Sequence, residues 1–423
     1  MAITSQSRSQ LAGAAVLFGS LCIASQSAGA QELELMHFWT SGGEAAAMNV
    51  IKEAAEEEGI EWRDAAVAGG SGMNAFQVLQ SRVAAGNPPA AMQMHGAQIH
   101  QYAEAGLLID LSDVATSEEW REVIDPNLLR YAEFDGSWVG IPFNIHRPNY
   151  VWANKEIMDR YGGNVPDNWN KFFELGDRMK ADGIIPLASG GQPWQDLLLW
   201  ELVLLGDQGQ DFHRRALIEQ DVSAIDSQEM RAAFETFRKV LDYTDPNRAN
   251  RDWNLATSMV MNGDAAMQVM GDWALGEFIS AGLEAGSDYI CEASPGTDGM
   301  YVWNADFWGF FKGLGEDGVE GQRTLATLTM SADVQEQFNV LKGSIPARTD
   351  IEANQFTPCG QQGIADRAAA LEAGTMVASF AQNSAQPTDV RGVYEDVVTQ
   401  FVGNPAMTAD QAVSQILDGL RSL

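Results

Sequence analysis

The stretch ELMHFWTSGGEAAAM, residues Glu34–Met48, joins an apolar run to a turn of small polar residues and then to a second apolar pattern. Leu33–Phe38 is predicted to be a short strand, and the chain from Glu44 onward, where apolar residues recur at helical spacing, is predicted to be a helix. Trp39 and Glu44 then lie in the turn between them. Because open α/β proteins bind ligands at strand ends of this kind, the stretch predicts an α/β fold with a site at this turn.

The first 30 residues have the pattern of a secretory signal peptide. Arg8 precedes the apolar run LAGAAVLFGSLCIA, and Ala28 and Ala30 occupy the small-residue positions of a cleavage site. The run is too short for a membrane-spanning helix of about 20 residues and is interrupted by Ser20. Cys22 lacks the small preceding residue expected of a lipoprotein anchor. We therefore expect cleavage near Ala30 and export of a soluble chain to the periplasm.

Length and charge limit the remaining possibilities. The 423 residues are 45% hydrophobic and 9% aromatic, which is typical of globular protein and enough for two domains. The chain has 58 Asp and Glu against 26 Lys and Arg, a formal charge of -32. Binding to nucleic acid or to anionic lipid needs basic patches, so neither is expected. The acidity suits solubility and is compatible with a saline habitat.

Two cysteines, Cys291 and Cys359, remain after the signal segment. In an oxidising compartment two such residues are more often paired than free, so a Cys291–Cys359 disulfide is predicted. No close cluster of Cys and His has the spacing of a zinc site. Neither a metal nor a cofactor is expected.

Strand-like and helical patterns alternate along the chain, which favours an α/β architecture with mostly parallel sheet. Pro142 and Pro148 keep the segment GIPFNIHRPNY extended. This segment fits a crossover between two α/β blocks, a linker, or a bulged edge strand. The other predicted strands are residues 33–38, 90–95, 184–189, 265–270 and 288–296, and the clearest predicted helices are 74–85, 170–182 and 227–244.

Several tryptophans stand beside acids or amides at predicted strand ends. Phe38-Trp39 precedes Glu44, Trp194 follows Gln192, Trp273 follows Asp272, and Asn304 and Asp306 follow Trp303. An aromatic face beside carboxylates and amides suits a neutral sugar, because the C–H face of the sugar packs on the ring while its hydroxyls need convergent hydrogen bonds.

Each candidate also has an ordinary structural explanation. Glu44 could simply occupy the first turn of a helix, where a negative charge is favourable by about 0.3 to 1 kcal/mol. His95 could be a buried structural histidine, and Lys342 a surface lysine. The Gly-rich AGGSGMNA segment at 68–75 lacks the Lys of a phosphate loop, and a flexible turn that caps a helix at Asn74 is the better interpretation.

Taken together, the segments resemble a periplasmic solute-binding protein of a carbohydrate ABC importer, in extracellular solute-binding protein family 1, and within it the glucose-binding proteins of bacterial sugar importers. The resemblance covers almost the whole chain after the signal segment, in order. It is carried by the segments HFWTSGGEAAAMNVI, VAGGSGMNAFQVLQSRVAAGNPP, QMHGAQI, VPDNWNKFFEL, GGQPWQDLLLWE, MGDWALGEF, SPGTDG, NADFWGFFKG and LKGSIPAR.

The resemblance implies a sugar site between two lobes. By position in the matching segments, the implied sugar contacts are Phe38, Trp39, Glu44, Gln93, His95, Trp194, Trp273, Asn304, Asp306 and Lys342.

Two positions depart from the pattern of the glucose binders. Phe38 stands where Trp is common, so the ring is smaller and lacks an N–H donor. Gln382, in VASFAQNSAQP, aligns with a His of those proteins and has a different reach and geometry. A sugar other than glucose, or a glucoside, is therefore compatible with the sequence.

The implied fold is a two-lobe α/β binding protein that closes like a hinge. Lobe I would comprise residues 31–141 and 304–345, and lobe II residues 142–303 and 346–423. The implied function is that of a monomeric, non-catalytic receptor that delivers a monosaccharide or small glucoside to an ABC permease in the inner membrane. It could also signal to a chemoreceptor.

The rival hypothesis is a secreted glycosidase that uses Glu44 and Asp306 as its two acids. No G-x-S-x-G, H-E-x-x-H, Walker or G-x-G-x-x-G motif is present. The neighbouring Lys342 and His95 would keep both acids ionised, which argues against the enzyme.

Overall fold

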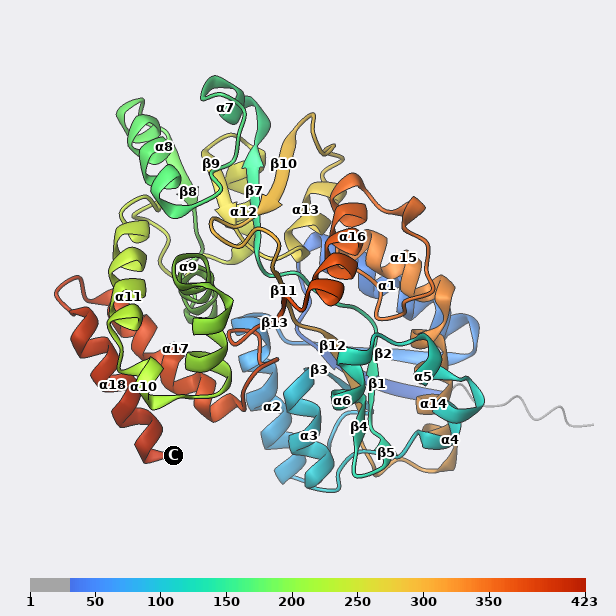
Figure 1. Cartoon of the computed structure of the whole chain (residues 1–423). Coiled ribbons are helices and arrows are strands. Elements are labelled where there is room, and N and C mark those ends of the chain that lie inside the picture. Colours follow the sequence, from blue (N-terminus) through green and yellow to red (C-terminus); the bar gives the residue numbers. More distant parts are fainter. Residues whose placement is uncertain (1–30) are drawn as a thin grey trace, which may run out of the picture. The chain divides into compact units, whose positions relative to one another are not determined.

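The computed structural model describes residues 31–423, so the predicted signal peptide lies outside the described residues. The chain from Gln31 to Leu423 forms two α/β groups, each built around its own sheet (Figure 1). The first sheet has the strand order β2-β1-β3-β12-β6. Its strands are β1 (Gln31–His37), β2 (Ile60–Ala66), β3 (Ala91–His95), β6 (Gly140–Pro142) and β12 (Asp306–Phe310).

The second sheet has the order β10-β7-β9-β8. Its strands are β7 (Tyr150–Asn154), β8 (Ile185–Ala188), β9 (Ala265–Val269) and β10 (Tyr289–Ala293). Two short ribbons pair β4 (Glu133–Phe134) with β5 (Ser137–Trp138) and β11 (Tyr301–Trp303) with β13 (Met376–Ala378).

The expectation of mostly parallel sheet is wrong, because both sheets are mixed. β1 pairs in parallel with β2 and β3, and β8 with β9. By contrast, β12 is antiparallel to β3 and β6, and β7 is antiparallel to β9 and β10. In the first sheet only β12, by which the chain returns from the second group, runs against the other strands, and such a long-range pairing is not visible in local alternation.

The helices cover the two sheets (Figure 1). Those that pack with the first sheet are α1 (Gly42–Glu57), α2 (Met73–Ala84), α3 (Gly96–Glu104), α4 (Ser112–Ser117), α5 (Trp120–Val123), α6 (Pro126–Ala132), α14 (Glu316–Met330) and α15 (Ala332–Lys342). Those that pack with the second are α7 (Lys155–Arg160), α8 (Trp169–Ala181), α9 (Pro193–His213), α10 (Val222–Ile225), α11 (Gln228–Leu241), α12 (Trp253–Met261), α13 (Trp273–Ser280), α17 (Thr388–Gly403) and α18 (Ala409–Ser422).

Local signals explain these boundaries. The turn η1 (Gly70–Gly72) leads into α2, η2 (Arg214–Ile218) extends α9, and η3 (Ala353–Gln355) precedes α16 (Pro358–Ala373). In α11 the side chain of Ser227 caps the helix by accepting from the Met230 amide. Met230, Ala233, Phe234, Phe237 and Val240 then recur on one buried face, which is the pattern that predicted this helix.

Two apolar cores follow the two sheets. One gathers buried residues between 33 and 145 and between 301 and 347, with Ala370. The other gathers residues between 150 and 302 and between 359 and 417. The lobe boundaries given above stay a prediction. A disulfide joins Cys291 of β10 to Cys359 of α16, with the Cα atoms 6.2 Å apart.

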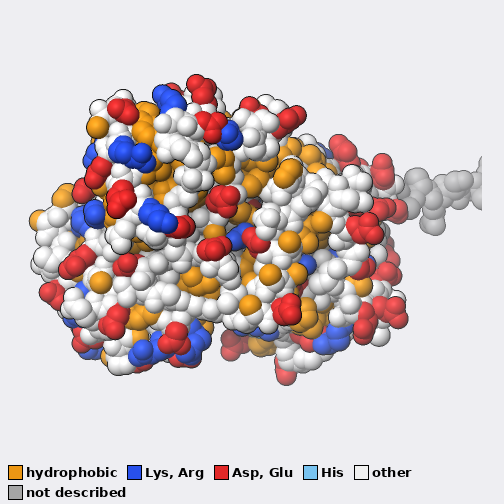
Figure 2. Space-filling view, turned by 45° about the horizontal axis from the view of Figure 1, so that its top comes forward, with side chains coloured by type: hydrophobic (Ala, Val, Ile, Leu, Met, Phe, Trp, Pro, Cys, Tyr) orange, Lys and Arg blue, Asp and Glu red, His pale blue; other side chains and the backbone are white. Residues whose placement is uncertain are grey.

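The chain has more acidic than basic residues, 58 against 26. Figure 2 shows acidic side chains spread over the visible face and gathered along one end of it, with basic side chains scattered between them. No helix within residues 31–423 is long and apolar enough to cross a bilayer.

The first turn of α1 lies against the backbone of α13. The amide of Gly43 donates to Glu277 Oε1 of α13 at 3.0 Å. A Cβ at position 43 would lie 2.6 Å from the Gly276 carbonyl carbon, whereas a Cβ at position 42 would have Ser280 Oγ as its nearest neighbour at 3.6 Å. Of these two residues, only position 43 must be glycine for the two helices to approach this closely.

We predict that Gly43→Ala destabilises the protein by about 1 to 3 kcal/mol, because the added methyl forces the two helices apart. Gly42→Ala is the matched control, since it brings the same change in helix propensity one residue earlier without the clash. Urea unfolding of both variants measures the difference. Equal free energies of unfolding would contradict the prediction.

Candidate functional site

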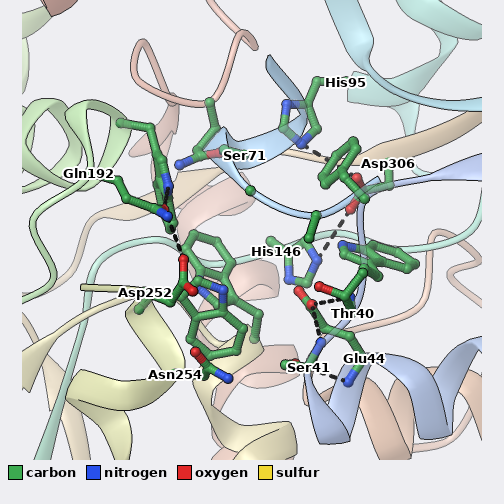
Figure 3. Close-up of a pocket in the computed structure, with 18 of the residues that line it drawn as sticks. Thr40, Ser41, Glu44, Ser71, His95, His146, Gln192, Asp252, Asn254 and Asp306 are labelled. Atoms are coloured by element: carbon green, nitrogen blue, oxygen red, sulfur yellow. Dashed lines mark hydrogen bonds and ion pairs between the residues drawn. The ribbon is translucent and has the colours of Figure 1, made fainter. Parts of the chain in front are cut away.

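A cavity of about 460 Å³ lies where the two α/β groups meet, and residues of both line it (Figure 3). Every sugar-binding residue predicted from the sequence lines this cavity except Gln93. The complete lining is Phe38, Trp39, Thr40, Ser41, Glu44, Ala68, Gly69, Ser71, His95, His146, Gln192, Trp194, Asp252, Trp253, Asn254, Trp273, Asn304, Asp306, Lys342 and Gln382.

Five helices, α1, α3, α9, α12 and α13, begin at this cavity. Trp194, Trp253 and Trp273 each occupy the first turn of a helix, so their rings stand at the cavity wall. The N-termini of helices carry partial positive charge and free amide donors, which favours oxygen atoms in the space they face.

Three residues at the start of these helices do not cap them with their side chains: Gln192, Asp252 and Asp272. Asp252 Oδ1 instead accepts a hydrogen bond from the Gln192 amide, and Gln192 Oε1 accepts from Trp194 Nε1 at 2.8 Å. The side chains of Gln192 and Asp252 are thus turned toward one another at the cavity wall, whereas the Asp272 carboxylate accepts from His146 and from the Arg147 amide.

The carboxylate of Asp306 is the most heavily bonded group of the site. It is 1% exposed, and it accepts from Gln93 Nε2 at 2.8 Å and Asn144 Nδ2 at 3.0 Å. The Nε2 atoms of His95 and His146 lie 3.4 and 3.2 Å from its oxygens. Burial alone would raise the pKa of Asp306, but the hydrogen bonds and charges of the two histidines lower it well below its usual range.

His146 is a site residue that the sequence interpretation missed. It lies in the extended segment between β6 and β7, where its Nδ1–H donates to Asp272 Oδ1 at 2.5 Å and its Nε2 faces Asp306. Burial opposes its charge, but the two carboxylates outweigh burial and raise the pKa of His146, while nearby Lys342 opposes them. The two flanking prolines were the only local signal that this histidine occupies a constrained place.

Glu44 both caps helix α1 and pairs with a buried lysine. Its Oε2 accepts from the amides of Thr40 and Ser41 at 3.0 and 3.1 Å, and Ser41 Oγ accepts from the Glu44 amide, so Glu44 completes a capping box on α1. Its Oε1 lies 3.8 Å from Lys342 Nζ. The ammonium of Lys342 also stands 4.9 Å from the ring centroid of Trp39, as a cation–π pair.

Several cavity residues carry a buried polar atom that no described residue hydrogen-bonds. Four of these atoms are nitrogens and one is an oxygen. Buried polar groups are normally paired, so each such atom is free for a ligand. They are His95 Nδ1, Trp273 Nε1, Lys342 Nζ, Gln382 Nε2 and Asn304 Oδ1.

Gln93 is the one predicted sugar contact that does not line the cavity, and its role as a contact stays a prediction. It is fully buried in β3, and its amide oxygen accepts from the Phe38 amide at 3.1 Å while its nitrogen donates to Asp306. Both ends of the side chain are therefore used to position two lining residues. Phe38 itself does line the cavity, and a Cβ at Gly72 would lie 2.8 Å from its ring.

The Gly-rich turn at 68–75 is part of the site. Ala68, Gly69 and Ser71 line the cavity, and Ser71 Oγ donates to Gln382 Oε1 at 3.1 Å. The interpretation of this turn as a cap at Asn74 is wrong: Gly72, with φ of 89°, precedes α2. The backbone of this turn approaches the cavity closely because its residues are small, and that smallness was the available signal.

Comparison with known proteins defines the class. The model of the family described as bacterial extracellular solute-binding protein matches residues 39–314. A "Probable sugar-binding periplasmic protein" of Mesorhizobium japonicum is 43% identical over 401 residues, 95% of this chain and 96% of that protein. An "Uncharacterized ABC transporter extracellular-binding protein" of Pyrococcus horikoshii is 28% identical, over 92% and 88% of the two chains.

Solved structures agree on the fold. The bacterial solute receptor AcbH, described as having an exclusive substrate preference for β-D-galactopyranose, superposes with a TM-score of 0.77 at 17% identity, over 93% of this chain and 99% of that one. The predicted two-lobe α/β periplasmic binding protein fold is thereby confirmed.

The chain belongs to the bacterial extracellular solute-binding protein family. It is a periplasmic or extracellular sugar-binding component of an ABC transporter, and it is a binding receptor rather than an enzyme. The glycosidase alternative is wrong, because the members of this family are binding receptors.

We predict that the stabilising contribution of His146 fades as pH rises. A histidine whose pKa is raised by folding stabilises the native state fully below its unfolded pKa of about 6.5 and loses that contribution as pH climbs through its folded pKa. Urea unfolding of the wild type and of His146→Gln, from pH 6 to pH 9, should show a gap in free energy that narrows with pH. A gap independent of pH would contradict the assignment.

Proposed function

We propose that the chain binds one ring of a neutral sugar, a monosaccharide such as glucose or a small glucoside, in this cavity and delivers it to the membrane permease of its ABC transporter. The observation that carries the proposal is the set of buried, unpartnered polar atoms between aromatic rings. Sugar hydroxyls can both accept and donate, so one ring can pair with the free nitrogens and with the free oxygen at once.

The aromatic residues that line the cavity favour a ligand with a flat apolar face. The rings of Trp194 and Trp273 lie 6.2 Å apart by centroid and both face the cavity. The indole nitrogen of Trp194 is occupied by Gln192, so this residue offers its face, whereas Trp273 offers both a face and a free N–H. Such a surface suits the C–H side of a sugar ring.

The charges support a neutral ligand. Three carboxylates line the cavity, those of Glu44, Asp252 and Asp306, against the ammonium of Lys342 and the imidazole of His146. An anionic sugar would meet repulsion from carboxylates in a partly dehydrated space, where charge is poorly screened. A neutral polyol meets acceptors and donors without that penalty.

Glucose itself is one candidate among several. Phe38 and Gln382 are the positions that differ from the glucose binders which the sequence resembles, and both line the cavity. Ser71 donates a hydrogen bond to the side-chain oxygen of Gln382, and the side-chain nitrogen of Gln382 has no partner among the described residues. Gln382 therefore offers a hydrogen-bond donor to the ligand.

Closure of the two lobes on the sugar is part of the proposal. The free atoms of His95, Asn304 and Lys342 belong to the proposed lobe I, and those of Trp273 and Gln382 to the proposed lobe II. A ligand that pairs with both sets would hold the lobes together, and the permease would recognise the closed form. We propose that the receptor works as a monomer.

We predict that Lys342→Met lowers sugar affinity by about tenfold to a hundredfold, because a hydrogen bond to a charged group contributes about 1.5 to 3 kcal/mol. The change removes the 3.8 Å ion pair with Glu44, but Glu44 keeps its hydrogen bonds from the Thr40 and Ser41 amides and a buried ammonium without a hydrogen-bond partner is itself costly, so the free energy of unfolding should change less than the free energy of binding. Isothermal titration calorimetry with monosaccharides and thermal unfolding measure the two effects.

Lys312→Met is the control, because Lys312 is exposed and lies outside the cavity lining. Trp273→Phe, which keeps a ring and removes the N–H, should weaken binding by about five- to tenfold. If no mono- or disaccharide binds the wild type, the proposed function fails. If Lys342→Met unfolds the protein, the lysine is structural.

A further inference from the structure

Gln382 lies on the turn at residues 379–384, which follows β13 and leads toward α17. The turn is in contact with the first α/β group as well, because the hydroxyl of Tyr131 in α6 donates to the Ser384 carbonyl. Gln382 itself is 2% exposed, and its Nε2 lines the cavity without a hydrogen-bond partner among the described residues. The position of this nitrogen is therefore set by whatever holds the turn.

The side chain that holds the first half of the turn is Glu201 of α9. It is fully buried and is not part of the cavity lining. Its Oε1 accepts from the Phe380 amide at 2.7 Å, and its Oε2 accepts from Ser379 Oγ and from the Ala381 amide, each at 2.9 Å. Three consecutive residues directly before Gln382 thus bond to one carboxylate.

A chain of hydrogen bonds connects Glu201 to Gln382. Ser379 Oγ donates to Glu201 and accepts from the Gln382 amide at 3.3 Å. From the first α/β group, Ser71 Oγ donates to the side-chain oxygen of Gln382. The backbone of Gln382 is therefore held from one side and its side-chain oxygen from the other, so that the side-chain nitrogen is turned to the ligand.

The helix α9 supports the cavity at two places. Trp194 lines the cavity in the first turn of α9, and Glu201 follows seven residues later, about two helical turns, on the same face. At the C-terminal end of the helix, His213 Nε2 lies 2.9 Å from Glu201 Oε1. One helix thus supplies an aromatic wall and also anchors the turn that carries Gln382.

The chemistry of a carboxylate fits this anchoring role. An ionised carboxylate accepts about four hydrogen bonds, and Glu201 has four partners, counting His213. Such charge-assisted bonds are about twice as strong as neutral ones, and a buried charge that loses its partners is costly. A neutral amide at this position would offer one acceptor oxygen and would direct an NH₂ group at the remaining donors.

We infer that Glu201 is a positioning residue for sugar binding. Through Ser379 and the two backbone amides it fixes the point at which the Gln382 nitrogen meets a hydroxyl of the sugar. This inference rests on the proposed function and adds to it a residue that acts on the ligand through another.

The test is a double-mutant cycle measured by calorimetric titration. The purified protein is titrated with D-glucose, D-galactose, D-mannose and methyl glucosides, and the cycle follows the sugar that binds the wild type most tightly. Glu201→Gln, which keeps the size of the side chain, should weaken binding about five- to tenfold, the effect of the Gln382 hydrogen bond. In a protein that already carries Gln382→Ala, the same change should alter the affinity less than about twofold.

Asp196→Asn is the matched control. Asp196 is another buried carboxylate of α9, and it bonds Arg248 instead of the turn, so its effect on affinity should be equal with and without Gln382. If Glu201→Gln weakens binding equally in both backgrounds, or does not weaken it, Glu201 only stabilises the fold and the inference is overturned while the proposed function stands. Binding of no sugar to the wild type overturns both.

Ser379→Ala is a second variant, to be used if thermal unfolding shows that Glu201→Gln does not fold. It leaves Glu201 with three partners but breaks the link to the Gln382 amide, so it should show the same dependence on Gln382. Hydrogen exchange followed by mass spectrometry examines the turn without sugar. The two amides that donate to Glu201 should exchange at least about tenfold faster in Glu201→Gln than in Asp196→Asn, and equal exchange would overturn the inference.

Discussion

The buried carboxylate of Asp306 is the interaction on which the rest of the site depends. It receives hydrogen bonds from Gln93 on β3 and Asn144 on the segment leaving the first sheet, and it faces His146, which in turn bonds Asp272 at the start of α13. A buried charge deprived of one partner costs about 3 to 5 kcal/mol, so each of these residues is constrained by the others. The two lobes therefore meet through a bonded chain of charges, and the cavity walls are positioned by it.

Around this chain the molecule repeats one local arrangement. A strand or turn ends, an aromatic residue stands at the first helical turn or just before it, and a polar side chain next to it faces the cavity. Trp39 with Glu44, Trp194 with Gln192 and Trp253 with Asp252 are the three instances, whereas the Asp272 carboxylate beside Trp273 bonds His146 and the Arg147 amide. Each pair combines an apolar face with a hydrogen-bonding group, and helix N-termini add their partial positive charge. Three such pairs and the ring of Trp273 facing one space explain why a small polar ligand with flat apolar faces suits it.

This repetition also explains what the sequence could predict. Strands, helices and the residues at their junctions follow from local periodicity, so Trp194, Trp273 and Glu44 could be found from their own neighbourhoods. His146 and Asp252 could not, because their roles depend on partners at Asp306 and Gln192, far away in the chain. Gln93 was placed in the site by resemblance, yet its amide is consumed by two neighbours. The mixed sheets were missed for the same reason, since the pairing of β12 with β3 joins residues more than 200 positions apart.

The unpaired buried nitrogens of the cavity wall set the balance between stability and binding. A buried donor without a partner costs about 1 to 3 kcal/mol, and a buried ammonium more, so a chain selected for stability alone would not keep Trp273 Nε1, Lys342 Nζ and Gln382 Nε2 in this state. Because these atoms come from segments in both proposed lobes, a sugar that accepts from all of them relieves the cost only when the segments are close together. Under the proposed closure, ligand binding and the approach of the lobes draw on the same free energy, and the affinity of the receptor is set by how well one sugar satisfies both sides at once.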